Sequence, residues 1–356
     1  MPDQESIRGQ LNLLDILRRR LRIELERKNK MGINTPSFVY TEIEEAQAQV
    51  RKIKEYLIRN SVDVKNLPED GEEESQSSTQ TQTPPNNQDA KIQTDTADFV
   101  IITALEEERE AVLRKLPNYQ RHDPSHNGIR VYYSADLPVT FPSGTRGTYH
   151  VIVLSLLGMG RVQAATATSD AIKQWHPRYV LLVGIAGGVA KAGVKIGDIL
   201  ISDQIADYEL QKLTPDGPEV RWQVHQVDQR FIGAVQNFQT AGWQDLITVE
   251  RPDDRAPKRH MGTIITGDKV IAVDDVLAKY ISMWPKLIGV EMEAGGAAVA
   301  AFQTSNAPGF FMIRGVSDLA NAKKSSSRVK GWRPYACDVA AAYTIALLKS
   351  GPVPLK

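Results

Sequence analysis

Two short apolar segments that each end in charged residues most constrain the fold of this chain. The first, at 289–293, reads Gly-Val-Glu-Met-Glu, and the second, at 311–318, reads Phe-Met-Ile-Arg-Gly-Val-Ser-Asp. A stretch of small residues that begins Ala-Gly-Gly at 294–296 lies between them and is expected to be helical. Apolar strands that alternate with helices and end in polar groups are typical of α/β folds, whose sites lie at the carboxyl ends of the strands.

Five further apolar runs predict more strands of the same sheet, at 99–104, 151–156, 179–183, 197–202 and 262–268. Buried strands of parallel sheets have this continuous apolar character. The alanine-rich tail from Tyr335 to Leu348 predicts a closing helix. We therefore expect a three-layer α/β domain over residues 98–352, with helices on both faces of a central mixed sheet of at least seven strands.

Residues 1–67 predict an α-helical hairpin. Apolar residues recur every three or four positions along two segments. They are Ile7, Leu11, Leu14, Leu17, Leu21 and Leu25 in the first, and Val39, Ile43, Ala46, Val50, Ile53 and Leu57 in the second. The break at 31–36 is short enough to make the two helices antiparallel. Neither helix can bury its stripe alone, so the hairpin is expected to be an adaptor or an oligomerisation segment.

Residues 68–97 predict a disordered polar linker. Between Pro68 and Asp89 the chain has no aliphatic or aromatic side chain. Such a segment cannot bury enough apolar surface to offset the entropy cost of ordering it. The boundary of the α/β domain is therefore expected near Asp98.

Charge and composition exclude several classes of partner. Lys plus Arg and Asp plus Glu number 43 each, so no overall field attracts nucleic acid or an anionic membrane. The basic cluster Arg18-Arg19-Arg20 indicates either a nucleic-acid arm or a solvated helix face, and the neighbouring Glu24 and Glu26 favour the second. One cysteine, no run of about 18 apolar residues and no secretory pattern after Met1 together predict a soluble cytoplasmic protein.

No cofactor or metal site is predicted. Gly158 and Gly160 follow a strand, but Gln163 stands where the third glycine of a dinucleotide fingerprint would be. His122 and His126 lie in a loop without a third ligand, which argues against zinc.

Seven short motifs follow one another in a fixed order along the α/β segment. They are Ala-Leu-Glu-Glu-Glu at 104–108, Gly-Met-Gly-Arg-Val at 158–162, Gly-Ile-Ala-Gly-Gly at 184–188, Gly-Val-Lys-Ile-Gly-Asp at 193–198, Thr-Gly-Asp at 266–268, Val-Glu-Met-Glu-Ala at 290–294 and Arg-Gly-Val-Ser-Asp at 314–318. In these motifs, residues 98–350 resemble the nucleoside phosphorylase and methylthioadenosine/S-adenosylhomocysteine nucleosidase family. The resemblance implies a nucleoside-phosphorylase-like fold and cleavage of an N-glycosidic bond.

Three carboxylates have the chemistry that such a cleavage needs. Asp318 can donate a proton to the leaving purine, Glu293 can accept hydrogen bonds from two ribose hydroxyls, and Glu108 can act as the base that orients water. The family positions imply the same roles. The alternative is structural: Glu106, Glu107 and Glu108 could merely favour a helix N-terminus, and Glu293 and Asp318 could be caps or ion-pair partners of Arg314.

The resemblance also implies contacts to base and ribose from Met292, Glu291, Val270, Ile271, Ser317, Arg314 and Gly187. Val270 replaces the phenylalanine of the nucleosidases, which removes an aromatic stack. Where the phosphorylases have a phosphate-binding loop and a serine, this chain has the acidic 105–108 and Ile185. Both disfavour an anion, so water is the expected nucleophile and hydrolysis is expected over phosphorolysis.

A basic segment after Asp318 departs most from the family. Lys323, Lys324, Arg328 and Lys330 lie among serines, and with Arg161 they could bind a 5′-phosphate or triphosphate. The alternative is a solvated basic loop. The following Trp-Arg-Pro-Tyr-Ala at 332–336 resembles nucleosidase domains of immune effectors that act on adenine nucleotides. The N-terminal hairpin resembles adaptor segments of bacterial conflict systems.

The sequence therefore predicts hydrolysis of a purine ribonucleotide of the ATP/AMP class, with release of adenine, by a defence-type effector. Alternatives are a methylthioadenosine/S-adenosylhomocysteine nucleosidase, a purine nucleoside phosphorylase and a catalytically silent nucleotide sensor. A homo-oligomer and a protein partner of the hairpin are expected, whereas nucleic acid and membrane are not.

Overall fold

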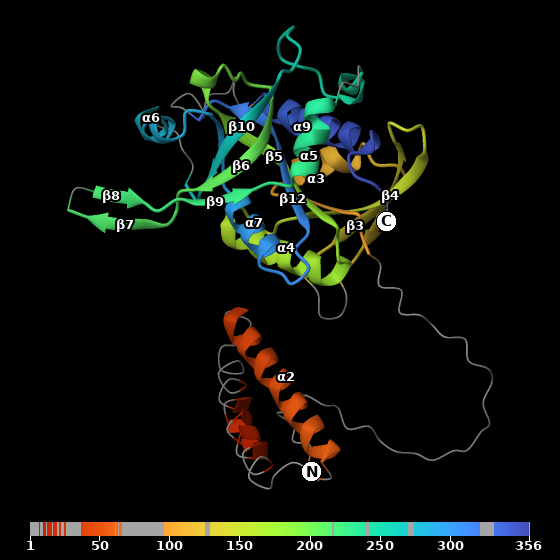
Figure 1. Cartoon of the computed structure of the whole chain (residues 1–356), viewed down its shortest axis with the longest axis vertical. Coiled ribbons are helices and arrows are strands. Elements are labelled where there is room, and N and C mark those ends of the chain that lie inside the picture. The colour runs from red at the N-terminus through yellow and green to blue at the C-terminus, as the bar shows by residue number, and fades with distance from the viewer. Residues whose placement is uncertain are drawn as a thin grey trace. The chain divides into compact units, whose positions relative to one another are not determined.

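The computed structural model describes residues 7, 10–11, 13–15, 17–19, 21–22, 25, 37–60, 62, 64–65, 96–124, 129–215, 217–238, 242–269, 274–320 and 331–355. The chain forms two compact units, Met1–Asp89 and Ala90–Lys356 (Figure 1). Residues 66–95, which contain most of the predicted linker, lie outside the described part. The boundaries 1–67, 68–97 and 98–352 therefore stay predictions.

The N-terminal unit contains the predicted helices. The described residues between Ile7 and Leu25 are helical, and α2 spans Ser37–Arg59. The two stripes bury each other in a cluster of Leu14, Leu17, Leu21, Ile43, Ala46, Val50, Ile53 and Leu57. Leu11, predicted for the stripe, is instead 38% exposed, because the helical repeat places it at the edge of the apolar face. The break at 31–36 lies outside the described residues.

Among the described residues of the second unit, ten strands form the main sheet. They are β1 (Phe99–Thr103), β2 (Gln120–His122), β3 (Tyr132–Thr140), β4 (Arg146–Ser155), β5 (Tyr179–Gly188), β6 (Ile199–Asp207), β9 (Gln223–Gln226), β10 (Arg259–Thr266), β11 (Leu287–Glu291) and β12 (Gly309–Asp318). Their order is β11-β10-β6-β12-β5-β1-β4-β3-β2, and β9 pairs with β6. Parallel pairs, such as β1–β5 and β12–β5, and antiparallel pairs, such as β12–β6, both occur. The predicted mixed sheet is confirmed.

A separate two-stranded ribbon, β7 (Gln211–Thr214) and β8 (Gly217–Val220), extends from the unit (Figure 1). The helices are α3 (Glu106–Leu113), α4 (Arg161–Trp175), α5 (Gln229–Asn237), α6 (Asp274–Met283), α7 (Ala294–Phe302) and α9 (Arg333–Lys349), with short η3 (Ala190–Ala192) and η4 (Trp243–Leu246). Within the described residues, no helix has the length and apolar character to cross a bilayer.

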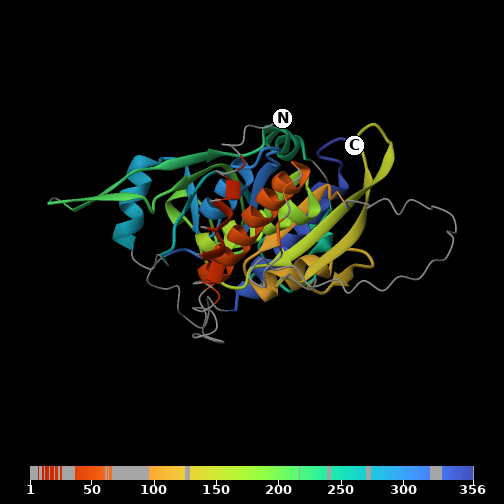
Figure 2. The same cartoon turned by 90° about the horizontal axis from the view of Figure 1, so that it is seen from below.

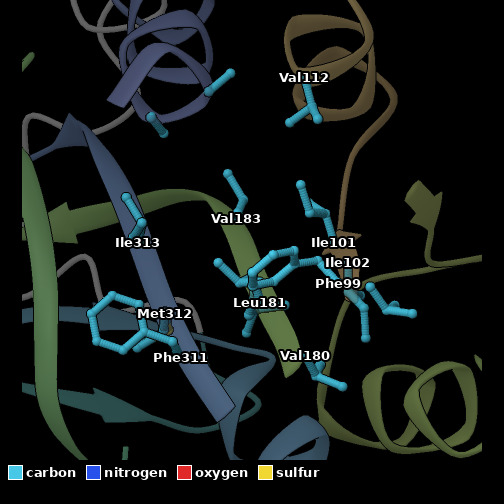
Figure 3. Close-up of a cluster of buried hydrophobic side chains, with 14 of the residues drawn as sticks. Phe99, Ile101, Ile102, Val112, Val180, Leu181, Val183, Phe311, Met312 and Ile313 are labelled. Carbon is cyan, nitrogen blue, oxygen red and sulfur yellow. The ribbon is translucent and has the colours of Figure 1, made fainter. Parts of the chain in front are cut away.

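The unit has three layers. Helices α3 and α9 cover one face of the sheet, and α4 and α7 cover the other (Figures 1 and 2). On the first face, Ile101, Val183 and Ile313 point from adjacent strands toward α3 and α9 (Figure 3). All three are buried, as the alternation of side chains on a strand covered on both faces requires. The predicted three-layer α/β fold is confirmed.

Strand register brings several carboxyl ends to one edge of the sheet. Arg314 pairs with Gly184 and Asp318 with Gly187 in the parallel pair of β12 and β5. Strand β11 then runs antiparallel beside the end of β5, where Val290 pairs with Gly187. The residues that follow β1, β5, β11 and β12 therefore converge.

Candidate active site

Arg314 is the centre of the buried charge at this edge. Its side chain on β12 is fully buried and forms ion pairs with Glu291 and with Glu293, whose Oε2 lies 3.1 Å from Nη2. Burial alone would lower the pKa of Arg314, but the charges of Glu291, Glu293 and Glu108 raise it. The guanidinium therefore stays positive and compensates a cluster of buried acids.

Glu291 holds the turn between β11 and α7. Its Oε2 accepts the backbone N–H of Glu293 at 3.1 Å and that of Ala294 at 3.0 Å, in addition to the bond from Arg314. These acceptors satisfy free N–H groups at the start of α7. Glu291 is thus a cap and an ion-pair partner, and the half-buried Met292 lies between it and Glu293.

Glu293 is buried and has an unusual protonation equilibrium. Burial raises its pKa to about 7, and the neighbouring charges of Glu291 and Glu108 add to the effect. The positive charge of Arg314 opposes the rise. A carboxyl that changes charge near neutral pH within a buried cluster is a frequent property of active sites.

Glu108 is the member of the acidic triplet that enters the site. Its Oε2 accepts the N–H groups of Ala104 at 2.7 Å and Leu105 at 3.0 Å, and its Oε1 accepts that of Ile185 at 2.8 Å. Burial raises its pKa, whereas Arg314 and these three N–H groups oppose the rise. Glu108 therefore caps its own helix, as the structural alternative supposed, but it also connects α3 to β5.

The other two acids of the triplet point away. Glu106 pairs with Arg109 at 3.0 Å, and Glu107 pairs with Arg333 at 2.7 Å, on exposed or half-exposed side chains.

Glu108 and Arg314 both lie against the backbone of Gly184. A Cβ atom at Gly184 would collide with both Glu108 Oε1 and Arg314 Nη1. Nη1 and Nε of Arg314 are buried and have no hydrogen-bond partner within the part of the chain that the structure describes. A buried donor and a buried carboxylate thus lie near each other where only glycine leaves room for both side chains.

Asp318 is the second acidic feature of the edge. Its Oδ2 accepts the hydroxyl of Ser317 at 3.0 Å, and its Oδ1 accepts the N–H of Ala320 at 2.8 Å. A Cβ at Gly187 would lie 3.1 Å from Oδ1, so glycine allows the close approach of β5. Ser317, Asp318 and Gly187, all predicted from the sequence, therefore lie together.

Arg161 is held in an ion pair at the start of α4. Its Nη2 lies 2.9 Å from Oδ2 of Asp207, a buried acid at the end of β6. Burial raises the pKa of Asp207, and the nearby charge of Arg161 opposes that rise. Sequence reasoning missed Asp207, although the apolar run before it has the same strand-end pattern as the segments at 289–293 and 311–318.

Several predicted contacts cannot be placed. Val270 and Ile271 of the base pocket and Lys323, Lys324, Arg328 and Lys330 of the basic segment lie outside the described residues. Their roles stay predictions.

Known proteins match parts of this chain. The death domain-containing ATP nucleosidase of Amphimedon queenslandica is 23% identical over 269 residues, which are 69% of this chain and 47% of that protein. The chain thus spans about half the length of that relative. A 5′-methylthioadenosine/S-adenosylhomocysteine nucleosidase of Haemophilus influenzae (strain 86-028NP) is 32% identical over 180 residues, 49% of this chain and 71% of the relative.

Solved structures show the same fold. The methylthioadenosine/S-adenosylhomocysteine nucleosidase of Neisseria meningitidis matches with a TM-score of 0.53 and 23% identity, over 70% of this chain and 98% of that one. That of Colwellia psychrerythraea 34H, in complex with adenine, matches with a TM-score of 0.55 and 23% identity, over 71% and 95%. The profile of the Phosphorylase superfamily matches residues 98–349, and this chain belongs to that superfamily.

Proposed function

We propose that the α/β unit is an N-ribosyl hydrolase that releases adenine from a purine ribonucleotide of the ATP/AMP class. The observation that carries the proposal is the approach of Glu108 Oε1 and the unpartnered Nη1 of Arg314 to the backbone of Gly184, at the edge that also bears Asp318. Relatives named as nucleosidases of ATP and of methylthioadenosine support an adenosine derivative as substrate.

The attacking water would bind to Glu108 and Arg314. Arg314 Nη1 would donate to its oxygen while Glu108 accepts its proton. Because burial raises the pKa of Glu108, this carboxylate is a stronger base than an exposed glutamate. The buried guanidinium fixes the water and prevents its diffusion away from the sugar.

Bond breaking would be divided between Glu293 and Asp318. Glu293 accepts hydrogen bonds from the ribose hydroxyls as positive charge develops on the sugar. The C1′–N9 electron pair leaves with the purine, and a protonated Asp318 donates its proton to N7. Water oxygen bonds to C1′, and the proton that Glu108 took returns through solvent to Asp318. The products are adenine and the ribose phosphate.

Water rather than phosphate is the proposed nucleophile. Ile185, whose N–H binds Glu108, presents an aliphatic side chain where the phosphorylases resembling this chain have a serine. Two buried carboxylates beside that position also repel an anion. A purine nucleoside phosphorylase is therefore the less favoured activity.

A nucleotide is proposed over a thioether substrate because of charge. The basic segment supplies cations and hydroxyls that suit a phosphate group, namely Lys323, Lys324, Arg328, Lys330 and the serines among them. A thioether would form neither ion pairs nor strong hydrogen bonds with these groups. Arg161 already pairs with Asp207, so its share in phosphate binding would use the remaining face of the guanidinium. Methylthioadenosine or S-adenosylhomocysteine is the second candidate, favoured by the relative from Haemophilus influenzae.

Adenine release tests the proposal directly. The purified chain is incubated with ATP, AMP and methylthioadenosine, and free adenine is separated by chromatography, with Glu108→Gln as the inactive control. We expect adenine from the nucleotides. Cleavage of methylthioadenosine alone would replace the nucleotide by the thioether substrate, and binding of ATP without release would indicate a silent sensor.

A role as a toxic defence effector extends the proposal. Depletion of an adenine nucleotide pool would be triggered by a protein partner of the N-terminal hairpin, whose buried stripe makes it a folded module. Cells that carry the wild-type chain should lose viability under the inducing signal, whereas cells with Glu293→Ala should survive. Equal survival of both would reject this role.

A homo-oligomer is also proposed. Leu157, Met159 and Val162, at the start of α4 beside the site, are 63%, 59% and 73% exposed, and a neighbouring subunit would cover them. Light scattering of the wild type and of Val162→Asp tests this. A monomeric wild type would contradict it.

A further inference from the structure

Three polar residues lie next to one another at the ends of three parallel strands. Thr266, the last residue of β10, pairs with Asp207 at the end of β6 and with Glu291 at the end of β11. All three are buried, and Thr266 is 0% exposed. Thr266 also begins the Thr-Gly-Asp motif at 266–268, to which the proposed function gives no role. Buried polar side chains have hydrogen-bond partners in folded proteins, and those of this row lie in the helix that follows β11.

The row covers the first turn of α7. Glu291 accepts the backbone N–H groups of Glu293 at 3.1 Å and of Ala294 at 3.0 Å. Thr266 Oγ1 accepts the next one along the chain, that of Gly295, at 3.1 Å. The N–H groups of a first turn have no partner within their helix. Three successive ones therefore bind to side chains of the row.

Asp207 and Arg161 confine the same turn from its outer side. They form an ion pair at 2.9 Å, and a Cβ on Gly295 would lie 2.6 Å from Asp207 Oδ2 and 3.2 Å from Arg161 Nε. A Cβ on Gly296 would collide with the carbonyl of Arg161. A turn that is packed this closely cannot shift unless its neighbours move too.

Glu293 depends on this turn for its position. Its carbonyl accepts the N–H groups of Gly296 and Ala297, both at 3.1 Å, so its backbone is part of the turn. Its side chain leaves the turn toward Arg314, with Oε2 3.1 Å from Nη2. The hydrogen bond of Thr266 to Gly295 holds the main chain only two residues beyond Glu293. Movement of the turn would therefore move the Glu293 carboxylate relative to Arg314.

We propose that Thr266 is a positioning residue, whose hydroxyl fixes the first turn of α7 and thereby the Glu293 carboxylate. It acts through Gly295 and needs no contact with the substrate. Its effect on turnover rests on the proposed function, in which Glu293 accepts hydrogen bonds from the ribose hydroxyls, whereas its effect on the turn does not.

Two substitutions test the hydroxyl of Thr266. Thr266→Val puts a methyl group in its place and leaves the N–H of Gly295 without this acceptor, whereas Thr266→Ser keeps the hydroxyl. With Thr266→Val, kcat/KM for the ribonucleotide that the wild type cleaves best should fall about tenfold, equivalent to about 1.4 kcal/mol. Thr266→Ser should recover most of this loss.

The sugar of the substrate provides a readout that a general loss of stability would not change. A 2′-deoxyribonucleotide offers Glu293 one hydroxyl where the ribonucleotide offers two, so displacement of the carboxylate should cost it less. The ratio of kcat/KM for the ribonucleotide to kcat/KM for the 2′-deoxyribonucleotide should therefore fall in Thr266→Val and return toward the wild-type value in Thr266→Ser.

Hydrogen exchange of the full chain follows the turn without reference to activity. Peptides that cover 291–300, measured by mass spectrometry under native conditions, should exchange faster in Thr266→Val than in the wild type or in Thr266→Ser. Thr263→Val is the matched control. Thr263 is a buried threonine of the same strand, but its Oγ1 accepts from Gln204 Nε2, at 2.8 Å. That variant should lose stability without changing the exchange of these peptides or the sugar ratio.

Gly295→Ala disturbs the same contact from the helix side. Its Cβ would lie 2.6 Å from Asp207 Oδ2 and 3.0 Å from Thr266 Cγ2, so the turn must move although the hydroxyl is present. We expect the same faster exchange and the same lower sugar ratio. This variant decides the proposal if Thr266→Val does not fold, and wild-type values of both quantities in it would then reject positioning.

The outcomes distinguish this proposal from the proposed function. If the wild type releases adenine and Thr266→Val keeps the wild-type exchange and sugar ratio, positioning by Thr266 is wrong and the proposed function stands. If Thr266→Val exchanges faster at 291–300 and not even the wild type releases adenine, Thr266 fixes the turn and the proposed function is wrong.

Two further results would reject positioning through the hydroxyl. Faster exchange with an unchanged sugar ratio would show that Thr266 holds the turn without placing Glu293. Equal losses in Thr266→Val and Thr266→Ser would show a need for the methyl group of threonine, which serine lacks, rather than for its hydroxyl.

Discussion

Arg314 Nη2 lies 3.1 Å from Glu293 Oε2, and both side chains are buried at the carboxyl edge of the sheet. The same guanidinium pairs with Glu291 and lies close enough to Glu108 to affect its pKa. One guanidinium is therefore the counter-charge of three carboxyl groups. Burial is the main reason why the pKa of Glu293 is raised in the folded chain, and the neighbouring charges of Glu291 and Glu108 add to the rise.

Arg314→Met should destabilise the α/β unit strongly. The substitution keeps most of the buried volume but leaves three acids without a counter-charge, and breaking a buried ion pair costs about 3–5 kcal/mol. Chemical denaturation followed by circular dichroism measures the change. Adding Glu291→Gln should recover part of the loss, since it removes one of the uncompensated charges. A single variant as stable as the wild type would mean that the cluster is solvated in solution.

Glu293 should make the stability of the fold depend on pH. Its ordinary pKa is 4.5, and burial raises it to about 7 in the folded chain. The folded state therefore retains a proton that the unfolded state releases, so this contribution to stability is complete below pH 4.5 and is lost as the pH rises through about 7. Glu293→Gln has no carboxyl group here and therefore lacks this pH-dependent contribution to the free energy of unfolding. The stability difference between the wild type and Glu293→Gln should change between pH 4.5 and 7, and a constant difference would contradict the raised pKa.

Asp318→Asn should slow adenine release by about 10²–10⁴, the usual contribution of a general acid. The amide oxygen can still accept from the N–H of Ala320, and the amide NH2 can donate to the Ser317 hydroxyl, so the local structure and KM should change little. Ser317→Ala removes a hydrogen bond but no transferable proton and should cost less. Unchanged kcat in Asp318→Asn would remove Asp318 from its assigned role.

The fold could be predicted because its signals are local. Continuous apolar runs such as 99–104 and 179–183 predict buried strands. The polar residues that follow these runs indicate the edge of the sheet where the site lies. The N-terminal stripes were equally clear, except at Leu11, where a three-and-four spacing does not distinguish the centre of an apolar face from its edge. Strand β6 extends to Asp207, five residues beyond the predicted end, because the polar Asp203 and Gln204 interrupt the apolar run.

The sequence could not predict which of the neighbouring glutamates faces the site and which one caps a helix. Glu106, Glu107 and Glu108 are identical in type, and only helix geometry turns Glu108 inward toward Ile185. Glu291 and Glu293 likewise differ only in which one reaches the N–H groups of α7. Contacts such as that of Asp268 with Arg161 join residues 107 positions apart and have no sequence signal.

Asp338 should be a major contributor to the stability of the unit. It is fully buried in α9 and accepts from Lys115 Nζ at 2.7 Å, from Thr248 N at 2.6 Å and from Val249 N at 3.1 Å. Asp338→Ala leaves the buried ammonium of Lys115 without its counter-charge and two backbone N–H groups without their acceptor, and it should cost about 3–5 kcal/mol in chemical denaturation.

The exposed pair of Asp123 with Arg121, at 2.8 Å, is the control for Asp338. Asp123→Ala should change stability by less than about 1 kcal/mol, because water screens the charges. Similar losses in the two variants would mean that burial does not strengthen the contacts of Asp338.

The oxygen source of the reaction distinguishes water from phosphate as the nucleophile. If Glu108 and Arg314 hold water beside Gly184, adenine release in ¹⁸O-labelled water should place the label on C1′ of the sugar product, and added inorganic phosphate should neither raise the rate nor appear in the product. Mass spectrometry of the sugar, within the time before its ring opening exchanges the label, measures this. Phosphate-dependent release with an unlabelled sugar 1-phosphate would show that Ile185 and the carboxylates around it admit the anion, and it would make the chain a phosphorylase.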